Sequence, residues 1–357
     1  DRHRQDPANK ILRSDSHAAK KSLQADQEIS AYAIDRLGIC IFRPTNSAFL
    51  REASFTVCLD TLCGGGVVAL PTETVYGLAC LALDEQAVQQ VFELKERPPT
   101  NPLIVHVLNF HQAEQIAHVN SIAKLLCQEF WPGPLTLILP KRQVIPDSVT
   151  AGLDTVAVRS PSHPLFRKIL QKTAQPIAAP SANRFSRVSS TTPQEVFDSF
   201  GKDCPPILDG GKCNIGLEST VLDLTSDAPS ILRPGPISKN ELEEFLGFEI
   251  FNSSKTSDSR VARKSPGLSA KHYSPETPIR LYKNISAIKQ IEHWTVDDLI
   301  ILPCDDLIAG FNSEPATIIT FSATSNAKGI AHNLYATLKQ ADQLGKKLIH
   351  LALLEET

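Results

Sequence analysis

Short apolar runs bounded by turn residues recur along the chain and alternate irregularly with helical patterns. The run at residues 67–70 follows three glycines and precedes a proline, which predicts a buried strand leaving a turn. Asp84 can cap a helix, because apolar residues recur at three- and four-residue spacing between positions 87 and 94. Pro98 and Pro99 forbid this helix to continue. A second apolar run then predicts another buried strand, at residues 103–107.

The same patterns extend over a large central part of the chain. Further strands are predicted at residues 135–139, 155–159, 177–180, 216–221 and 231–235. Further helices are predicted at residues 46–62, 109–130 (one or two helices), 161–171 and 193–200. Because strands and helices alternate without a regular βαβ order, we expect a mixed α/β domain over residues 46–250.

The C-terminal part shows a more regular pattern after a polar connection. Residues 252–278 hold seven serines, three prolines and five Lys/Arg against two acidic residues, which indicates a linker. From 279 onward, strands are predicted at 279–282, 299–302, 317–321 and 348–353, with helices ending near 291 and at 330–344. This order predicts a small Rossmann-like α/β domain at 279–357. It lacks a G-x-G-x-x-G, so we assign it no dinucleotide.

Length and composition are those of a soluble protein of about two domains. The 357 residues are 42% hydrophobic and 21% charged, and no apolar run approaches the roughly 18 residues of a membrane span. The N-terminus shows no apolar signal core, and the polar residues 1–45 predict a loosely ordered extension with one short helix. Eight cysteines show no metal-binding spacing, and several lie in apolar runs, as reduced thiols do. We therefore expect a cytoplasmic protein with no membrane partner.

Candidate chemistry gathers where the predicted strands and the first capped helix end. The segment 72–74 (Thr-Glu-Thr) follows one strand, Lys95 and Arg97 end the helix, and His106 lies in the next strand. If these groups share a cleft, they form an anion-binding pocket in which substitution of either cation would barely affect folding. The alternative is ordinary structure, because cations complement a helix dipole and Thr and Glu are common in turns. Neither a P-loop, a G-x-S-x-G elbow nor a histidine metal spacing occurs in the sequence.

Six motifs in one order connect this pocket to a known family. They are P-T-E-T-V-Y-G-L, K-x-R-P-x-x-N-P-L-I-V-H, A-V-R-x-P-x-H-P, A-P-S-A-N, G-x-E-S-T-V and L-R-P-G. Over residues 50–245 the chain thus resembles the YrdC-type threonylcarbamoyl-AMP synthases. The segment 265–275 (S-P-G-L-S-A-K-H-Y-S-P) and the α/β tail resemble the longer two-domain members. The resemblance implies a mixed, twisted sheet with a deep cleft.

The resemblance also implies a reaction. L-Threonine, bicarbonate and ATP would give threonylcarbamoyl-AMP and pyrophosphate, and the product would supply the threonylcarbamoyl group of a tRNA adenosine beside the anticodon. ATP is then a substrate, and Mg²⁺ is expected with its phosphates. The implied partners are the downstream tRNA threonylcarbamoyl-transfer machinery and, with weak affinity, tRNA itself.

Site residues carry over where this sequence matches the motifs. The resemblance assigns L-threonine to Thr74, His106, Arg159 and Ser219. It assigns ATP to Arg97, Asn101, Thr155, Ser181, Asn183, Ser189 and Arg233, and it implies catalytic roles for Lys95 and Arg97. An arginine can bind a carboxylate bidentately, and two cations can neutralise charge that builds as pyrophosphate leaves. In the linker, Lys271, His272 and Tyr273 are expected to form a lid; the alternative is a plain tether.

Some features depart from the family pattern, and two other functions compete. Ser269 stands where the family linker commonly has lysine, and residues 1–45 match no family we recognise. One rival is an RNA-binding module whose pocket cations track a phosphate backbone, but aromatic residues are only 6% and do not interleave with these cations. The other is a carbamoyl-transfer domain acting on a different carbamoyl-adenylate. A net charge of −3 argues against wholesale coating of nucleic acid.

Overall fold

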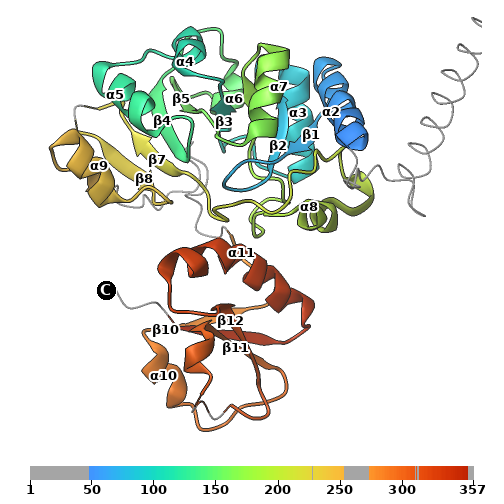
Figure 1. Cartoon of the computed structure of the whole chain (residues 1–357), viewed down its shortest axis with the longest axis vertical. Coiled ribbons are helices and arrows are strands. Elements are labelled where there is room, and N and C mark those ends of the chain that lie inside the picture. Colours follow the sequence, from blue (N-terminus) through green and yellow to red (C-terminus); the bar gives the residue numbers. More distant parts are fainter. Residues whose placement is uncertain (1–47, 227, 253–272, 310, 312, 353–357) are drawn as a thin grey trace, which may run out of the picture.

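The computed structural model describes residues 48–226, 228–252, 273–309, 311 and 313–352, with the side chains of 48–53 excepted. These residues form a large domain, up to Asn252, and a small domain from Pro278 onward (Figure 1). The predicted extension at 1–45 lies outside the described residues.

The large domain is built on one mixed sheet, which confirms the expected fold class. Its strand order is β1-β2-β6-β3-β5-β4-β7-β8-β9, with parallel pairs β3–β5, β4–β7 and β8–β9 and antiparallel pairs elsewhere. The strands are β1 (Val68–Leu70), β2 (Gly77–Leu81), β3 (Ile104–His106), β4 (Leu135–Pro140), β5 (Thr155–Arg159), β6 (Ile177–Ala178), β7 (Thr220–Asp223), β8 (Ser230–Arg233) and β9 (Phe251–Asn252). β2 was not predicted, and β9 lies beyond the predicted end of the domain at residue 250 and includes Asn252, the first residue of the predicted linker.

The helices begin and end at residues that explain their limits. They are α2 (Ala48–Cys63), α3 (Glu85–Lys95), α4 (Phe110–Ile116), α5 (Ser121–Phe130), α6 (Asp147–Thr150), α7 (Pro164–Thr173), α8 (Pro193–Phe200), the 3-10 turn η1 (Gly201–Asp203) and α9 (Lys239–Leu246). Asp84 caps α3 as predicted, because its carboxylate accepts hydrogen bonds from the backbone N–H groups of Gln86 and Ala87. The helix ends at Lys95, because the next residue, the C-cap Glu96, has a left-handed φ of 53°.

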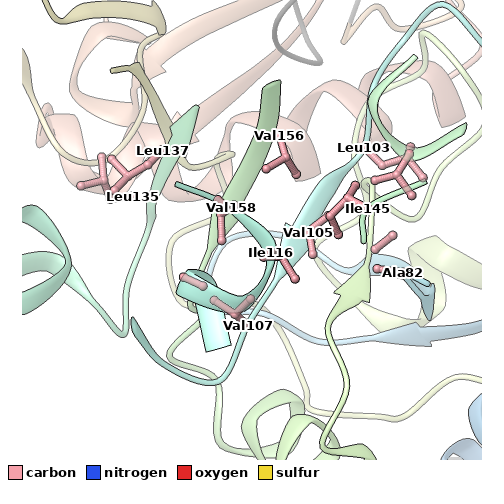
Figure 2. Packing of buried hydrophobic residues seen from close by; sticks show 14 of the residues in the cluster. Ala82, Leu103, Val105, Val107, Ile116, Leu135, Leu137, Ile145, Val156 and Val158 are labelled. Carbon is pink, nitrogen blue, oxygen red and sulfur yellow. The ribbon is translucent and has the colours of Figure 1, made fainter. Parts of the chain in front are cut away.

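The two faces of this sheet are covered differently. Val105, Leu137 and Val158 point to one face, where the main core packs against helices that include α3, α4 and α5 (Figure 2). On the other face, α2 and α7 pack over β1, β2 and β6. The middle of that second face carries only a small apolar cluster, with Ile104 of β3 and Ala157 of β5 among its members. Because strand residues alternate between faces, His106 and Arg159 must also emerge there.

The small domain matches the predicted Rossmann-like unit. Its parallel strands lie in the order β10-β13-β11-β12. They are β10 (Ile279–Tyr282), β11 (Asp298–Cys304), β12 (Thr317–Ser322) and β13 (Leu348–Ala352). α11 (Ala327–Gln343) packs on one face, while α10 (Ile285–Lys289) and Trp294 pack on the other, and η2 (Asp305–Leu307) follows β11.

The helix α11 is also the surface that meets the large domain (Figure 1). A Cβ added to Gly216 would lie 2.3 Å from the carbonyl oxygen of His332, and the φ of Gly216 is +77°. Only glycine fits this close approach. The His332 ring hydrogen-bonds the carbonyl of Asn214 (2.8 Å), and Lys212 donates to Asn333 (2.8 Å). The two domains therefore share a hydrogen-bonded interface.

Candidate active site

A pocket lies on the second face of the sheet, where Ile104, His106 and Arg159 emerge; we call it the central pocket. It is lined by Thr72, Thr74, Val75, Gly77, Arg97, Ile104, His106, Arg159, Ala179, Pro180, Ser181, Glu218, Ser219, Arg233 and Tyr273. Parts of the chain far apart in sequence meet here because β6 inserts between β2 and β3 in the sheet.

The loop after β1 is shaped by its own hydroxyl groups. The Thr72 hydroxyl donates to the carbonyl of Val75 (2.7 Å) and accepts from the backbone N–H groups of Thr74 (3.1 Å) and Val75 (3.2 Å). This is a Ser/Thr turn. Because the Thr72 proton is used, Thr74 donates in the 2.8 Å hydroxyl pair that the two threonines form. The turn thereby orients the Thr74 side chain in the central pocket.

Arg159 ends β5 with its guanidinium held in place. It donates from Nη1 to the Thr74 hydroxyl (2.9 Å), from Nη2 to Glu73 (2.6 Å) and from Nε to the Gly133 carbonyl (3.2 Å). Burial alone would raise the pKa of Glu73, but the charge of Arg159 and its hydrogen bond lower it below the ordinary value. Of the five guanidinium N–H groups, three are engaged in these bonds, so the fork is fixed before a ligand binds.

His106 brings a neutral imidazole to the central pocket. The side chain is 3% exposed, and its ring centroid lies 5.1 Å from that of Phe166. Burial, reinforced by the charge of Arg159, lowers the pKa of His106 to about 3. Among the described residues, its Nδ1 atom has no hydrogen-bond partner. A buried polar atom in this state is suited to a ligand's hydroxyl or amine group.

Lys95 does not face an open cleft, so that expectation is wrong. It is the last residue of α3 and is 1% exposed, and its ammonium donates to the carbonyls of Ser181 and Asn183 at 2.5 Å each. Burial lowers the pKa of Lys95 well below its ordinary value. Lys95 therefore ties the loop after β6 to α3, and the pocket is lined by Ser181 of that loop.

Arg97 lines the central pocket directly. Its Nε donates to the carbonyl of Asn101 (3.3 Å) and its Nη2 to that of Pro102 (2.9 Å). Burial lowers the pKa of Arg97 to about 10, with Tyr273 opposing the shift, so the guanidinium stays protonated at neutral pH. It is a buried positive charge held by backbone carbonyls.

The G-x-E-S-T-V segment forms the opposite wall. Arg233 donates to the Ser219 carbonyl from Nε (3.1 Å) and Nη2 (2.9 Å), and to the Tyr273 hydroxyl from Nη1 (3.1 Å). Burial would lower the pKa of Arg233, but Tyr273 and Glu218 raise it above the ordinary value. Glu218 accepts a hydrogen bond from the Ser189 hydroxyl. Cations and one carboxylate thus lie together in this part of the pocket.

The structure gathers about half of the predicted residues in the pocket wall. Those that line it are Thr74, Arg97, His106, Arg159, Ser181, Ser219, Arg233 and Tyr273. Lys95, Asn101 and Ser189 do not line it but hydrogen-bond the wall residues Ser181, Arg97 and Glu218, and Asn183 bonds Lys95 and, through its backbone N–H, the Ser181 carbonyl. Thr155 begins β5, at the opposite end from Arg159, and pairs with Pro140. Lys271 and His272 lie outside the described residues.

Sequence reasoning placed Thr72 and Glu73 in the candidate segment 72–74 but gave them no ligand role, and it did not single out Glu218. Each belongs to a motif quoted above, and Glu73 and Glu218 are only 6% and 8% exposed. The sequence contains a signal for the two glutamates, because each is a charged residue in a strand-end motif whose other residues are small or apolar.

The described residues show neither a metal cluster nor a membrane-spanning element. They contain no group of three or more His, Cys, Asp or Glu placed to hold a metal ion. In the same part of the chain, no helix is long and apolar enough to cross a membrane. Cys58, Cys80, Cys127, Cys213 and Cys304 are buried free thiols, as the sequence predicts.

The fold and the pocket define a two-domain α/β protein with a buried, cation-lined ligand site. A family model described as "Telomere recombination" (Sua5, YciO and YrdC) matches residues 60–235. A second, described as "Threonylcarbamoyl-AMP synthase, C-terminal domain", matches residues 237–357. The chain belongs to the Sua5/YrdC family of threonylcarbamoyl-AMP synthases, in its two-domain form.

Named relatives agree with this family. A threonylcarbamoyl-AMP synthase of Pyrococcus abyssi is 38% identical, over 84% of this chain and 88% of the relative. The synthase of Bacillus subtilis is 44% identical over 60% of this chain and 62% of the relative, and thus matches less than two thirds of its length. The crystal structure of P. abyssi Sua5 complexed with L-threonine superposes with a TM-score of 0.76 at 35% identity, covering 86% of this chain and 90% of that one.

Proposed function

We propose that this protein is an L-threonylcarbamoyladenylate synthase, which makes threonylcarbamoyl-AMP and pyrophosphate from L-threonine, bicarbonate and ATP. The observation that carries the proposal is the central pocket itself. It combines a fixed arginine fork and a neutral imidazole at one set of strand ends with two buried cations in the same cavity, Arg97 just after α3 and Arg233 at the end of β8. Family membership and the threonine-bound relative support it.

The amino-acid end of the pocket is assigned to Arg159, Thr74, His106 and Ser219. Because Glu73 and Gly133 hold the Arg159 guanidinium, its remaining N–H groups can bind the threonine carboxylate without reorganisation. The neutral His106 Nδ1 can accept a hydrogen bond from the threonine hydroxyl or amine, since it has no partner among the described residues. The pocket then binds two polar groups of threonine at once, the carboxylate and either the hydroxyl or the amine.

The nucleotide end is assigned to Arg97, Ser181 and Arg233 in the pocket wall. Lys95, Asn101 and Asn183 support these residues by hydrogen bonds, and Ser189 holds Glu218. Thr155, at the opposite end of β5 from Arg159, is assigned to ATP on the resemblance alone. Arg97 and Arg233 are both protonated at neutral pH and 7% exposed, so their charges act in a medium of low dielectric. These two positive charges suit the binding of a triphosphate, because negative charge builds on the pyrophosphate as it leaves.

The chemistry then needs no protein nucleophile. The threonine amine adds to bicarbonate with loss of water to give a carbamate. A carbamate oxygen attacks the α-phosphorus of ATP, the bond to the β-phosphate oxygen breaks, and pyrophosphate leaves with the electron pair. The buried cations stabilise the negative charge on the departing pyrophosphate. Arg159 holds the threonine carboxylate, which keeps the carbamate in line with the α-phosphorus. Mg²⁺ would arrive with ATP and add charge neutralisation there; Glu218 is the carboxylate in the pocket wall that could approach it.

We divide the chain into domains at residues 46–250 and 279–357, joined by a linker at residues 251–278. The position of Tyr273 supports a role for this linker as a lid. Tyr273 reaches the central pocket, where its hydroxyl accepts from Arg233, and the next residue donates its backbone N–H to the Ser186 carbonyl (3.1 Å). We assign Lys271 and His272 to the same lid. A closed lid would exclude water from a hydrolysis-prone mixed anhydride, and it must open for release.

The product would pass to tRNA threonylcarbamoyl-transfer machinery in the cytoplasm, with tRNA itself bound weakly. The proposal is tested by measuring pyrophosphate release while threonine, bicarbonate and ATP are each omitted in turn. Release should require all three. Release from ATP alone at the same rate would identify a simple pyrophosphohydrolase and overturn the proposal.

A further inference from the structure

One side chain of the small domain reaches the wall of the central pocket. Tyr335, on α11, is 5% exposed, and its hydroxyl donates to one carboxylate oxygen of Glu218. The other oxygen of Glu218 accepts from the Ser189 hydroxyl of the large domain. This buried carboxylate is therefore held by both domains at once. Burial and the negative charge of Glu218 hold the pKa of Tyr335 well above its ordinary value, so it remains a proton donor.

The ring of Tyr335 supports a second part of the wall. It stacks on the ring of Tyr273, with centroids 5.6 Å apart and planes inclined by 26°. The Tyr273 hydroxyl in turn accepts from Arg233. One residue of α11 thus contacts two neighbouring pocket-lining residues, Glu218 by its hydroxyl and Tyr273 by its ring.

Glu218 is the reason these contacts bear on ligand binding. Its charge raises the pKa of Arg233, which is assigned to the nucleotide end, and the pKa of Lys95, which anchors the loop after β6, relative to burial alone. If Glu218 lost the hydrogen bond from the Tyr335 hydroxyl, its carboxylate would pair with a neighbouring cation instead. That cation would then bind phosphate more weakly. The two hydroxyls hold the carboxylate in an orientation that leaves the arginine donors directed elsewhere.

We propose that Tyr335 is a positioning residue of the active site, through which the small domain sets Glu218 and Tyr273 for ATP binding. The inference rests on the proposed function for the identity of the ligand. It gives the small domain a role in the pocket rather than in stability alone. Other α11 residues at the interface differ, because Asn333 and His332 bond Lys212 and Asn214, which are not pocket-lining residues.

The test compares three full-length variants with the wild type. Tyr335→Phe keeps the ring and removes the hydroxyl, Tyr335→Leu removes both, and Asn333→Ala is the control from the same helix and interface. Binding of ATP and of L-threonine is measured separately by titration calorimetry, and pyrophosphate release gives kcat and KM for each substrate. Melting temperatures verify that every variant is folded at the assay temperature.

Loss of a hydrogen bond to a charged group predicts that Tyr335→Phe weakens ATP binding by about 10- to 100-fold while changing threonine binding by less than about twofold. Tyr335→Leu should bind ATP more weakly still. Asn333→Ala should bind ATP and L-threonine with the same affinities as the wild type. Wild-type ATP affinity in Tyr335→Phe would overturn the inference, as would equal losses in Tyr335→Phe and Asn333→Ala. A wild type that releases no pyrophosphate would refute the proposed function, whereas the ATP titrations would still decide the role of Tyr335.

Discussion

Replacing Lys95 by methionine should destabilise the large domain as well as slow the reaction. Methionine preserves most of the buried aliphatic stem but removes the ammonium that holds the Ser181 and Asn183 carbonyls. Each hydrogen bond to a charged group is worth about 1.5–3 kcal/mol, and the relief of burying the ammonium opposes their loss. We therefore expect the free energy of unfolding to fall by about 3 kcal/mol.

The matched control is Lys172→Met. Lys172 is also a lysine in the last turn of a helix, α7, but it is exposed. Its substitution should change the free energy of unfolding by less than about 0.5 kcal/mol. The chain has two tryptophans, so a Trp294→Phe background leaves Trp131 to report unfolding of the large domain.

Urea unfolding of both variants in that background supplies the measurement. The Lys95→Met transition should move to lower urea at an unchanged slope, with pyrophosphate release reduced about a hundredfold even where the protein is fully folded. Superimposable urea transitions for Lys95→Met and Lys172→Met would refute the anchoring role. Normal turnover in folded Lys95→Met would show that the Ser181 loop needs no such anchor.

Other changes test the remaining assignments. Arg97→Ala should lower turnover about a hundredfold in single-turnover pyrophosphate release, because it removes one buried cation; undiminished release would exclude Arg97 from the site. Serine should react about 10- to 200-fold more slowly than threonine in the same assay, and valine more slowly still because pocket groups lose their partners; equal rates for valine and threonine would contradict the assignment of Thr74 and His106. The folded pKa of His106, about 3, lies below the ordinary 6.5, so the unfolded chain takes up a proton first as pH falls and stability is lost between these values. His106→Gln should remove about 2 kcal/mol of the stability difference between pH 7 and pH 5 in urea unfolding, and an unchanged pH slope would show that His106 is not buried as described.

The main elements were predictable because their local signals agree. Asp84 and the paired prolines mark the two ends of α3, and the apolar runs mark β3 and β5. By contrast, β2 was overlooked, since its residues Gly-Leu-Ala-Cys-Leu are small or apolar and a helix cap follows almost at once. The helix α9 carried a legible signal that we missed, the capping box formed by Ser238 and Glu241.

The site was predictable as a set of residues but not as a geometry. Motif order identified the residues near the pocket, yet the order of strands in the sheet decides which of them line it. Lys95 shows the limit, because a lysine in the last turn of a helix is ordinarily exposed and only tertiary packing buries this one. Tyr335 shows another, since α11 lies more than a hundred residues from Glu218 and its amphipathic pattern gives no sign that it faces a second domain.

The most direct measurement is mass spectrometry of the reaction product formed from ¹³C-bicarbonate, L-threonine and ATP. The account predicts a threonylcarbamoyl-AMP ion that is one mass unit heavier than with ordinary bicarbonate, and its loss when Arg159 is replaced by methionine. A product of AMP and pyrophosphate alone, or an adenylate that carries no label, would contradict the claim that this pocket joins threonine, bicarbonate and ATP.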